Sequence, residues 1–160
     1  MKAVRKAGNL TPTFRVIEAD PIDCHILIDR LRPGHINALL GAGRSPLMDL
    51  RRDFDHSCIR RAWLIDGTLA GLGGVVGTRL SINGWIWLGL TDEAPRYPVE
   101  IVKEARRQIA EFLGTFQILT TTISLADPAA RRFARFMGFV DRPDIPAPDG
   151  TVAVQIRRPA

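Results

Sequence analysis

DPAARRFARFMGF, residues Asp127–Phe139, has the start and stop signals of a short amphipathic helix. Asp127 is a good N-cap residue, and Pro128 suits the first helical position because its fixed φ matches the helix. Gly138 suits the position just past the helix, where the backbone often turns left-handed. Apolar side chains gather on one face and arginines on the other: Ala130, Phe133, Ala134 and Met137 opposite Arg131, Arg132 and Arg135. We therefore predict a helix that buries one face and exposes the other.

The residues before this helix predict a strand, a longer helix and another strand. Residues 98–113 place apolar side chains on one face at a period of 3.6, which indicates a helix that opens at a proline. Residues 117–124, QILTTTIS, are rich in β-branched side chains and are typical of a buried strand. A further strand, IWLGL at 86–90, follows an Asn83-Gly84 turn. A helix between two strands of one sheet implies a parallel crossover.

An antiparallel hairpin is predicted at Arg61–Val76, RAWLIDGTLAGLGGVV. Its Asp66-Gly67 pair is the strongest short hairpin signal. Its glycines indicate a bulge or a close backbone approach, and they stand at Gly71, Gly73 and Gly74.

The two ends of the chain complete the pattern. A strand is predicted at 13–19, a last strand at 151–156, and helices from Pro21, His35 and Pro46, the first and third capped by Asp20 and Ser45. These elements predict an α/β (α+β) fold with a mixed, mostly antiparallel sheet of six to seven strands and helices on both faces. We expect residues 1–12 to be a flexible basic tail and residues 13–160 to be a single domain.

The composition of the chain argues against several classes of protein function. The 160 residues are 46% hydrophobic and 24% charged, which is typical of a globular protein, and no apolar run is long enough to span a membrane. The basic N-terminus lacks the apolar stretch of a signal peptide, so we expect a cytoplasmic protein. A net charge of +5 without a nucleic-acid-binding motif makes nucleic acid an unfavoured partner. Cys24 and Cys58 lack zinc-ligand spacing, so we expect buried or half-buried thiols and no metal.

The order of these segments resembles the fold of the GCN5-related N-acetyltransferase (GNAT) superfamily. DPAARRFARFMGF is similar to the late-helix motif of that family, with Asp127 at the position of the family's Asn and Gly138-Phe139 at its close. The hairpin resembles the family's second and third strands, and the resemblance covers residues 14–140. The segments LRPGHINALL, AWLIDG and WLGLTDE are also similar to GNAT-like proteins of tailed phages and prophages, of the internal virion protein A type.

The resemblance implies an N-acyltransferase with acetyl-CoA as co-substrate and a small-molecule or protein amine as acceptor. The positions that match the family's cofactor-binding elements are Leu88, Gly89, Leu90, Arg96, Asp127, Arg131 and Phe133. The candidate bases are Asp92 and Glu93, just past the fourth strand, and His35, whose imidazole has an ordinary pKa of about 6.5. Each has a plainer interpretation: a solvated turn for the two acids and a surface side chain for the histidine.

Two departures from the family keep a second hypothesis open. The family's glycine-rich pyrophosphate loop is replaced by Thr91–Pro98, TDEAPRYP, which has no glycine, two prolines and two acids. Ala134 stands where the family often has a tyrosine that protonates the departing thiolate. The alternative is therefore a catalytically inactive phage or prophage accessory or virion-associated protein, which acts through contacts with a phage protein or with a second copy of itself.

Overall fold

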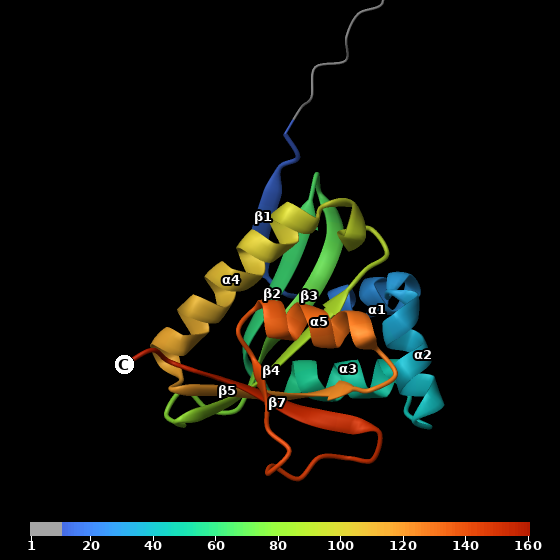
Figure 1. The fold of residues 1–160 in the computed structure, drawn as a ribbon. Helices are drawn as coiled ribbons and strands as arrows, with labels where there is room; N and C mark the ends of the chain where they lie inside the picture. The colour runs from blue at the N-terminus through green and yellow to red at the C-terminus, as the bar shows by residue number, and fades with distance from the viewer. Residues whose placement is uncertain (1–10) are drawn as a thin grey trace, which may run out of the picture.

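The computed structural model describes residues 11–160, and its elements follow the order that the sequence indicates (Figure 1). The strands are β1 Phe14–Glu18, β2 Ser57–Ile65, β3 Thr68–Val76, β4 Asn83–Leu90, β5 Ile118–Ser124, β6 Val140–Asp141 and β7 Thr151–Arg157. The helices are α1 Pro21–Arg30, α2 Pro33–Gly41, α3 Pro46–Asp55, α4 Pro98–Thr115 and α5 Pro128–Phe136, with a 3₁₀ turn, η1, at Ala94–Arg96. The predicted tail of residues 1–12 lies outside the described residues except for its last two.

The strands between residues 11 and 160 form one sheet in the order β1-β2-β3-β4-β5-β7-β6. Neighbouring strands run antiparallel except β4 and β5, which run parallel with α4 as the crossover between them. Helices α4 and α5 cover one face of the sheet, and α1, α2 and α3 lie on the other (Figure 1). The predicted mixed, mostly antiparallel sheet with helices on both faces is confirmed. None of the helices in the described part of the chain has the length and apolar character that a membrane crossing requires.

Side chains that alternate along β2 and β3 build a core on each face of the sheet. Trp63 and Val75 belong to the cluster under α4 and α5, whereas Ala62 and Leu72 belong to the cluster under α1 and α3. Cys24 is fully buried in the second cluster, and burial raises the pKa of its thiol to about 11. This thiol therefore packs as a small apolar group, as the sequence predicts.

The local signals in the sequence place most element boundaries correctly. Asp20 caps α1, and the Asp23 carboxylate accepts a hydrogen bond from the Asp20 N–H at 2.8 Å, which completes a capping box. Ser45 caps α3 through its side chain. The β2–β3 turn places Asp66 and Gly67 at positive φ, 50° and 79°, as a tight hairpin requires.

The predicted Asn83-Gly84 turn is wrong, because both residues are the first residues of β4. Gly84 lies against the core cluster under α4 and α5. A Cβ atom there would lie 2.6 Å from Val75 Cγ1 and 3.0 Å from the Phe116 ring. The glycine is needed for close packing inside the sheet, which the dipeptide alone does not reveal.

Two other boundaries and one short strand differ from the predictions. β2 begins at Ser57, four residues before the predicted Arg61, because its bulged start still pairs with β3. α2 begins at Pro33 instead of His35, since proline is favourable at the first helical position. β6 was not predicted, because its two residues become a strand only by pairing with β7, as in Val140 with Gln155.

The predicted close approach in the glycine-rich strand is confirmed at Gly74. A Cβ atom there would lie 2.1 Å from the carbonyl oxygen of Ile59, next to the register shift between Ser57 and Ile59. The obstacle is backbone, so a side-chain rotation cannot remove it.

We expect Gly74→Ala to lower the free energy of unfolding by about 1 to 3 kcal/mol, because the added methyl group forces the bulge apart. Urea unfolding measures the change. Gly114→Ala is the control, because a Cβ atom at Gly114 meets nothing within 4 Å near the end of α4. That control is expected to be neutral or to stabilise by up to about 1 kcal/mol. Equal effects of the two substitutions would contradict the steric explanation.

Candidate active site

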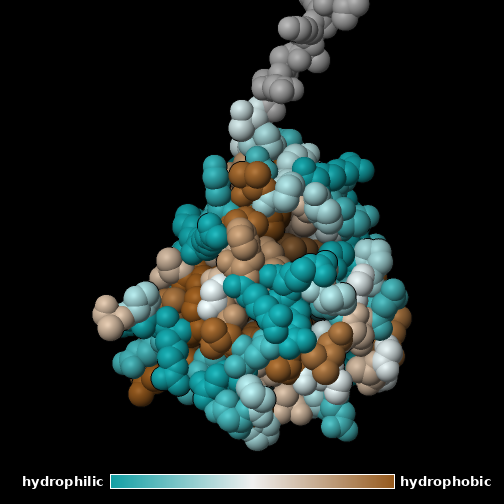
Figure 2. All heavy atoms as spheres, in the orientation of Figure 1, coloured by the Kyte–Doolittle hydropathy of each residue, from teal (hydrophilic) through white to brown (hydrophobic). Residues whose placement is uncertain are grey.

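The parallel strands β4 and β5 separate soon after they begin. They pair only over Asn83–Trp85 and Ile118–Thr120, although β4 continues to Leu90 and β5 to Ser124. The two strands therefore leave a wedge-shaped gap between them. A cavity of about 690 Å³ fills the gap and reaches both faces of the sheet. Figure 2 shows hydrophobic surface between α4 and the hydrophilic side chains over α5.

The cavity wall combines strands and helices from both layers. On the sheet it includes residues 86–90 of β4 and 121–124 of β5. On one side α4 contributes Ala105, Gln108, Ile109 and Phe112, and on the other α2 and α3 contribute His35, Leu50 and Asp53. A molecule in this cavity can thus be reached from either face of the sheet.

The edge of β4 that faces the gap carries backbone donors. The Thr91 N–H donates to Ala70 O in β3 at 3.0 Å, whereas Leu90 O accepts from the Arg32 N–H at 2.9 Å on the opposite edge. Because successive residues of a strand direct their backbone groups to alternate edges, the N–H groups of Leu88 and Leu90 point toward the gap. Three of the predicted cofactor-binding positions, the two leucines and Gly89 between them, therefore line the cavity.

A partly buried ion pair lies in the cavity wall. Arg32, just before α2, donates from Nη2 to Asp127 Oδ2, and both residues line the wall. Asp127 is only 5% exposed, and its Oδ1 also accepts from the Ala130 N–H at 3.2 Å, so it caps α5 as predicted. Arg32 is not among the site residues that the sequence pattern predicts. The carboxylate of Asp127 was the one indication of it, because a charged side chain that becomes buried needs a partner of opposite charge.

His35 lies in the first turn of α2 and lines the same cavity. Burial, followed by the nearby Arg32 charge, lowers the pKa of its imidazole below the ordinary value, and the Asp127 carboxylate only partly opposes this. The imidazole is therefore neutral at pH 7 and able to accept a proton. The structure places this histidine, alone among the three predicted catalytic residues, in the cavity wall.

Asp92 and Glu93 lie beside the cavity wall and bind an arginine of α1. Arg30 Nη2 lies 3.3 Å from Asp92 Oδ1 and 3.4 Å from Glu93 Oε1. Arg96, in η1, lies 3.3 Å from Glu93 Oε2 and leaves 73% of its side chain exposed. The loop after β4 is thus held onto α1, and the charges of its acids are already matched by arginines.

The arginines of α5 bind the neighbouring strand. Arg131 donates to Asp141 Oδ2 at 2.6 Å and Arg135 donates to the same atom at 2.8 Å. These two hydrogen bonds hold the pKa of the Asp141 carboxyl below its usual range. Phe133 lines the cavity, as does Ala134, the residue at the position of the family's tyrosine. The structure therefore brings Phe133 to the gap and directs Arg131 to β6.

Comparisons with known proteins identify the fold. No protein-family model matches the sequence, and no curated protein is similar to it in sequence. Among solved structures, the aminoglycoside acetyltransferase AAC(6')-Ib in complex with coenzyme A has a TM-score of 0.66 and 17% identity, over 91% of this chain and 95% of that one. Spermidine N-acetyltransferase from Vibrio cholerae, in complex with CoA and spermine, has a TM-score of 0.63 and 11% identity, over 90% and 95%. An acetyltransferase of the GNAT family from Streptococcus pneumoniae has a TM-score of 0.55 and 14% identity, over 91% and 100%.

Proposed function

We propose that this chain, with residues 13–160 as one domain, is an N-acyltransferase that moves the acyl group of acetyl-CoA or a related thioester directly to an amine. One observation carries the proposal: the edge of β4 at Leu88–Leu90, with which β5 does not pair, faces a large cavity, in a fold shared with acetyltransferases whose structures contain CoA. A substrate thioester in that gap would find backbone donors at the carbonyl oxygen where negative charge develops.

The residues of the gap fit the narrow arm of CoA. The arm is a chain of amides, and the N–H groups of Leu88 and Leu90 offer it the hydrogen bonds that a neighbouring strand would make. Phe133 and Ala134 supply apolar wall on the α5 side. CoA, when bound, supplies the activated acyl group.

The site offers fewer hydrogen-bond donors and cations to the pyrophosphate end of CoA than to the arm. The loop after β4 has no glycine, and α4 begins with Pro98, which has no N–H to donate. Arg96 is the exposed cation of this loop, and Arg30 already balances Asp92 and Glu93. We therefore expect the arm to provide most of the binding free energy.

In the proposed reaction His35 is the base. The amine attacks the thioester carbon, a C–N bond forms, and the C–S bond breaks. His35 accepts the proton that the amine loses, and the departing thiolate takes up a proton from His35 or from solvent. In this proposal Asp92 and Glu93 position the loop after β4 and do not take the proton.

Binding of CoA without its nucleotide half tests the proposal. At a ligand concentration about 100 times its Kd, binding raises the free energy of unfolding by about 2.7 kcal/mol, so a melting curve shifts upward. We expect acetyl-CoA to raise the melting temperature and S-acetylpantetheine, which lacks the nucleotide, to keep most of that effect. Glycine amide, a small amide without the thioester and without the arm, serves as the ligand control. No shift at millimolar acetyl-CoA would contradict the proposal.

The second candidate function is a non-catalytic GNAT-fold module, a phage or prophage accessory carried in the cytoplasm or the virion. The loop without glycine and Ala134 at the tyrosine position favour it. Such a module would show no melting shift with acetyl-CoA and would release no thiol from it. The acceptor probes that separate the two are spermine and ribostamycin, amines bound in structures of the same fold.

A further inference from the structure

A buried amide on α4 points into the cavity without a hydrogen-bond partner. Gln108 is 3% exposed and lines the cavity wall. Its Nε2 donates to Glu104 Oε1 at 2.9 Å, but its Oε1 is buried and has no partner among residues 11–160. A buried carbonyl oxygen without a donor is costly, so its presence needs an explanation.

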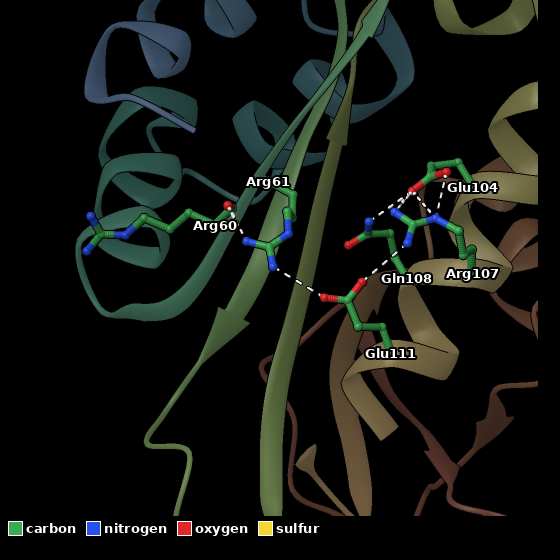
Figure 3. Close-up of polar contacts among 6 residues, drawn as sticks. All are labelled: Arg60, Arg61, Glu104, Arg107, Gln108 and Glu111. Atoms are coloured by element: carbon green, nitrogen blue, oxygen red, sulfur yellow. Dashed lines mark hydrogen bonds and ion pairs between the residues drawn. The ribbon is translucent and has the colours of Figure 1, made fainter. Parts of the chain in front are cut away.

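The orientation of this amide is enforced by its surroundings. A carboxylate only accepts hydrogen bonds, so the Glu104 side must face the NH₂ group of Gln108 and the oxygen must face the other way. Glu104 is itself held by Arg107, which donates to it from Nη2 at 2.6 Å and from Nε at 3.0 Å. Figure 3 shows the Gln108 oxygen directed away from Glu104 toward the strands.

A second ion pair joins α4 to the sheet close to Gln108. Arg61 in β2 lies 3.3 Å from Glu111 of α4, one turn beyond Gln108 (Figure 3). Arg61 pairs in register with Gly73 of β3, and Gly73 pairs with Leu88 of β4. The middle of α4 therefore lies over the row of residues that ends at Leu88, whose N–H faces the gap.

Gly73, in the middle of this row, lies close to the neighbouring strand β4. Gly73 has no side chain, and a Cβ atom there would lie 2.8 Å from Trp87 O and 3.2 Å from Leu88 Cδ1. Gln108 and Gly73 both line the cavity, so the space between helix and sheet is continuous with the gap.

We propose that Gln108 Oε1 accepts a hydrogen bond from an N–H or O–H group of the thioester substrate, near its reacting carbonyl. This inference rests on the proposed function and names a specificity-determining residue on α4. Two groups have this chemistry: the amide N–H of the arm that all CoA thioesters share, and a hydroxyl on the acyl chain. Glu104 acts on the substrate only through Gln108 and is a positioning residue.

The test compares three thioesters with the wild type and with Gln108→Met, which keeps the length of the side chain and removes its amide. The Kd is measured for acetyl-CoA, butyryl-CoA and 3-hydroxybutyryl-CoA, the last two differing by one hydroxyl. If the arm amide is the donor, we expect all three to bind Gln108→Met about fivefold more weakly. If the acyl hydroxyl is the donor, only 3-hydroxybutyryl-CoA loses about fivefold. Unchanged Kd values for all three overturn the proposal.

Two further variants complete the test: one is a control, and the other tests the proposal independently of Gln108→Met. Lys103→Gln is the control, because Lys103 is exposed on α4 and does not line the cavity. Glu104→Gln retains Gln108 but lets its amide face either way, so a loss of about twofold is expected there even if Gln108→Met fails to fold. If the wild type binds no thioester at all, both this inference and the proposed function fail. If it binds all three and Gln108→Met and Glu104→Gln match it, only the inference fails.

Discussion

Replacing His35 by glutamine is expected to lower kcat/KM for acyl transfer by about 10² to 10⁴, the usual contribution of a general base. His35 lines the cavity, and its lowered pKa leaves it neutral at pH 7. Glutamine preserves the size and polarity of the side chain but cannot take a proton from the amine. Thiol release from acetyl-CoA, with whichever of spermine and ribostamycin supports turnover, measures the change.

The pH profile distinguishes a base from a structural side chain. As the pH falls, the imidazole becomes protonated and can no longer accept the amine proton, so wild-type activity falls on the acid side. Because the pKa of His35 is lowered, this fall is centred below about pH 6.5, the ordinary value for histidine. We expect the acid limb to be absent in His35→Gln and present in His25→Gln, whose histidine is exposed on α1. An unchanged limb in His35→Gln would refute the assignment.

Asp127→Ala is expected to lower the free energy of unfolding by about 3 kcal/mol or more. The substitution leaves Arg32 partly buried without its counter-charge, which commonly costs about 3 to 5 kcal/mol. It also removes the N-cap of α5, worth about 1 kcal/mol. Urea unfolding measures the sum.

The two contributions can be separated by matched variants. Asp127→Asn keeps a capping oxygen and removes the charge, so it should lose less stability than Asp127→Ala. Asp20→Ala removes the N-cap of α1, which is exposed, and should cost only about 1 kcal/mol. If Asp127→Ala costs no more than Asp20→Ala, the ion pair with Arg32 contributes nothing to stability.

Much of the fold could be predicted because its signals are local. Asp20, Ser45 and Asp127 each precede a proline and cap a helix, and Asp66-Gly67 closes the hairpin. These choices depend only on backbone preferences within a few residues. The parallel order of β4 and β5 follows from the helix between them.

The candidate site was less predictable because its contacts join distant segments. Arg32 and Asp127 are separated by 95 residues and meet only once α2 and α5 have docked at the same end of the sheet. Arg131 faces Asp141, a pairing that requires the unpredicted strand β6. Gln108 has the polar character of a surface position, and only the packing of α4 on the sheet reveals that it is buried.

The short contact between β4 and β5 makes the sheet two half-sheets joined by a three-residue seam. Strands β1 to β4 form one half, and β5, β7 and β6 form the other. A molecule that lies in the gap and bonds to both halves takes the place of a missing strand. Ligand binding and the coupling between the two halves of the sheet are then thermodynamically linked. A change that stiffens the seam between β4 and β5 therefore also changes the affinity for the ligand, even when the change lies far from it.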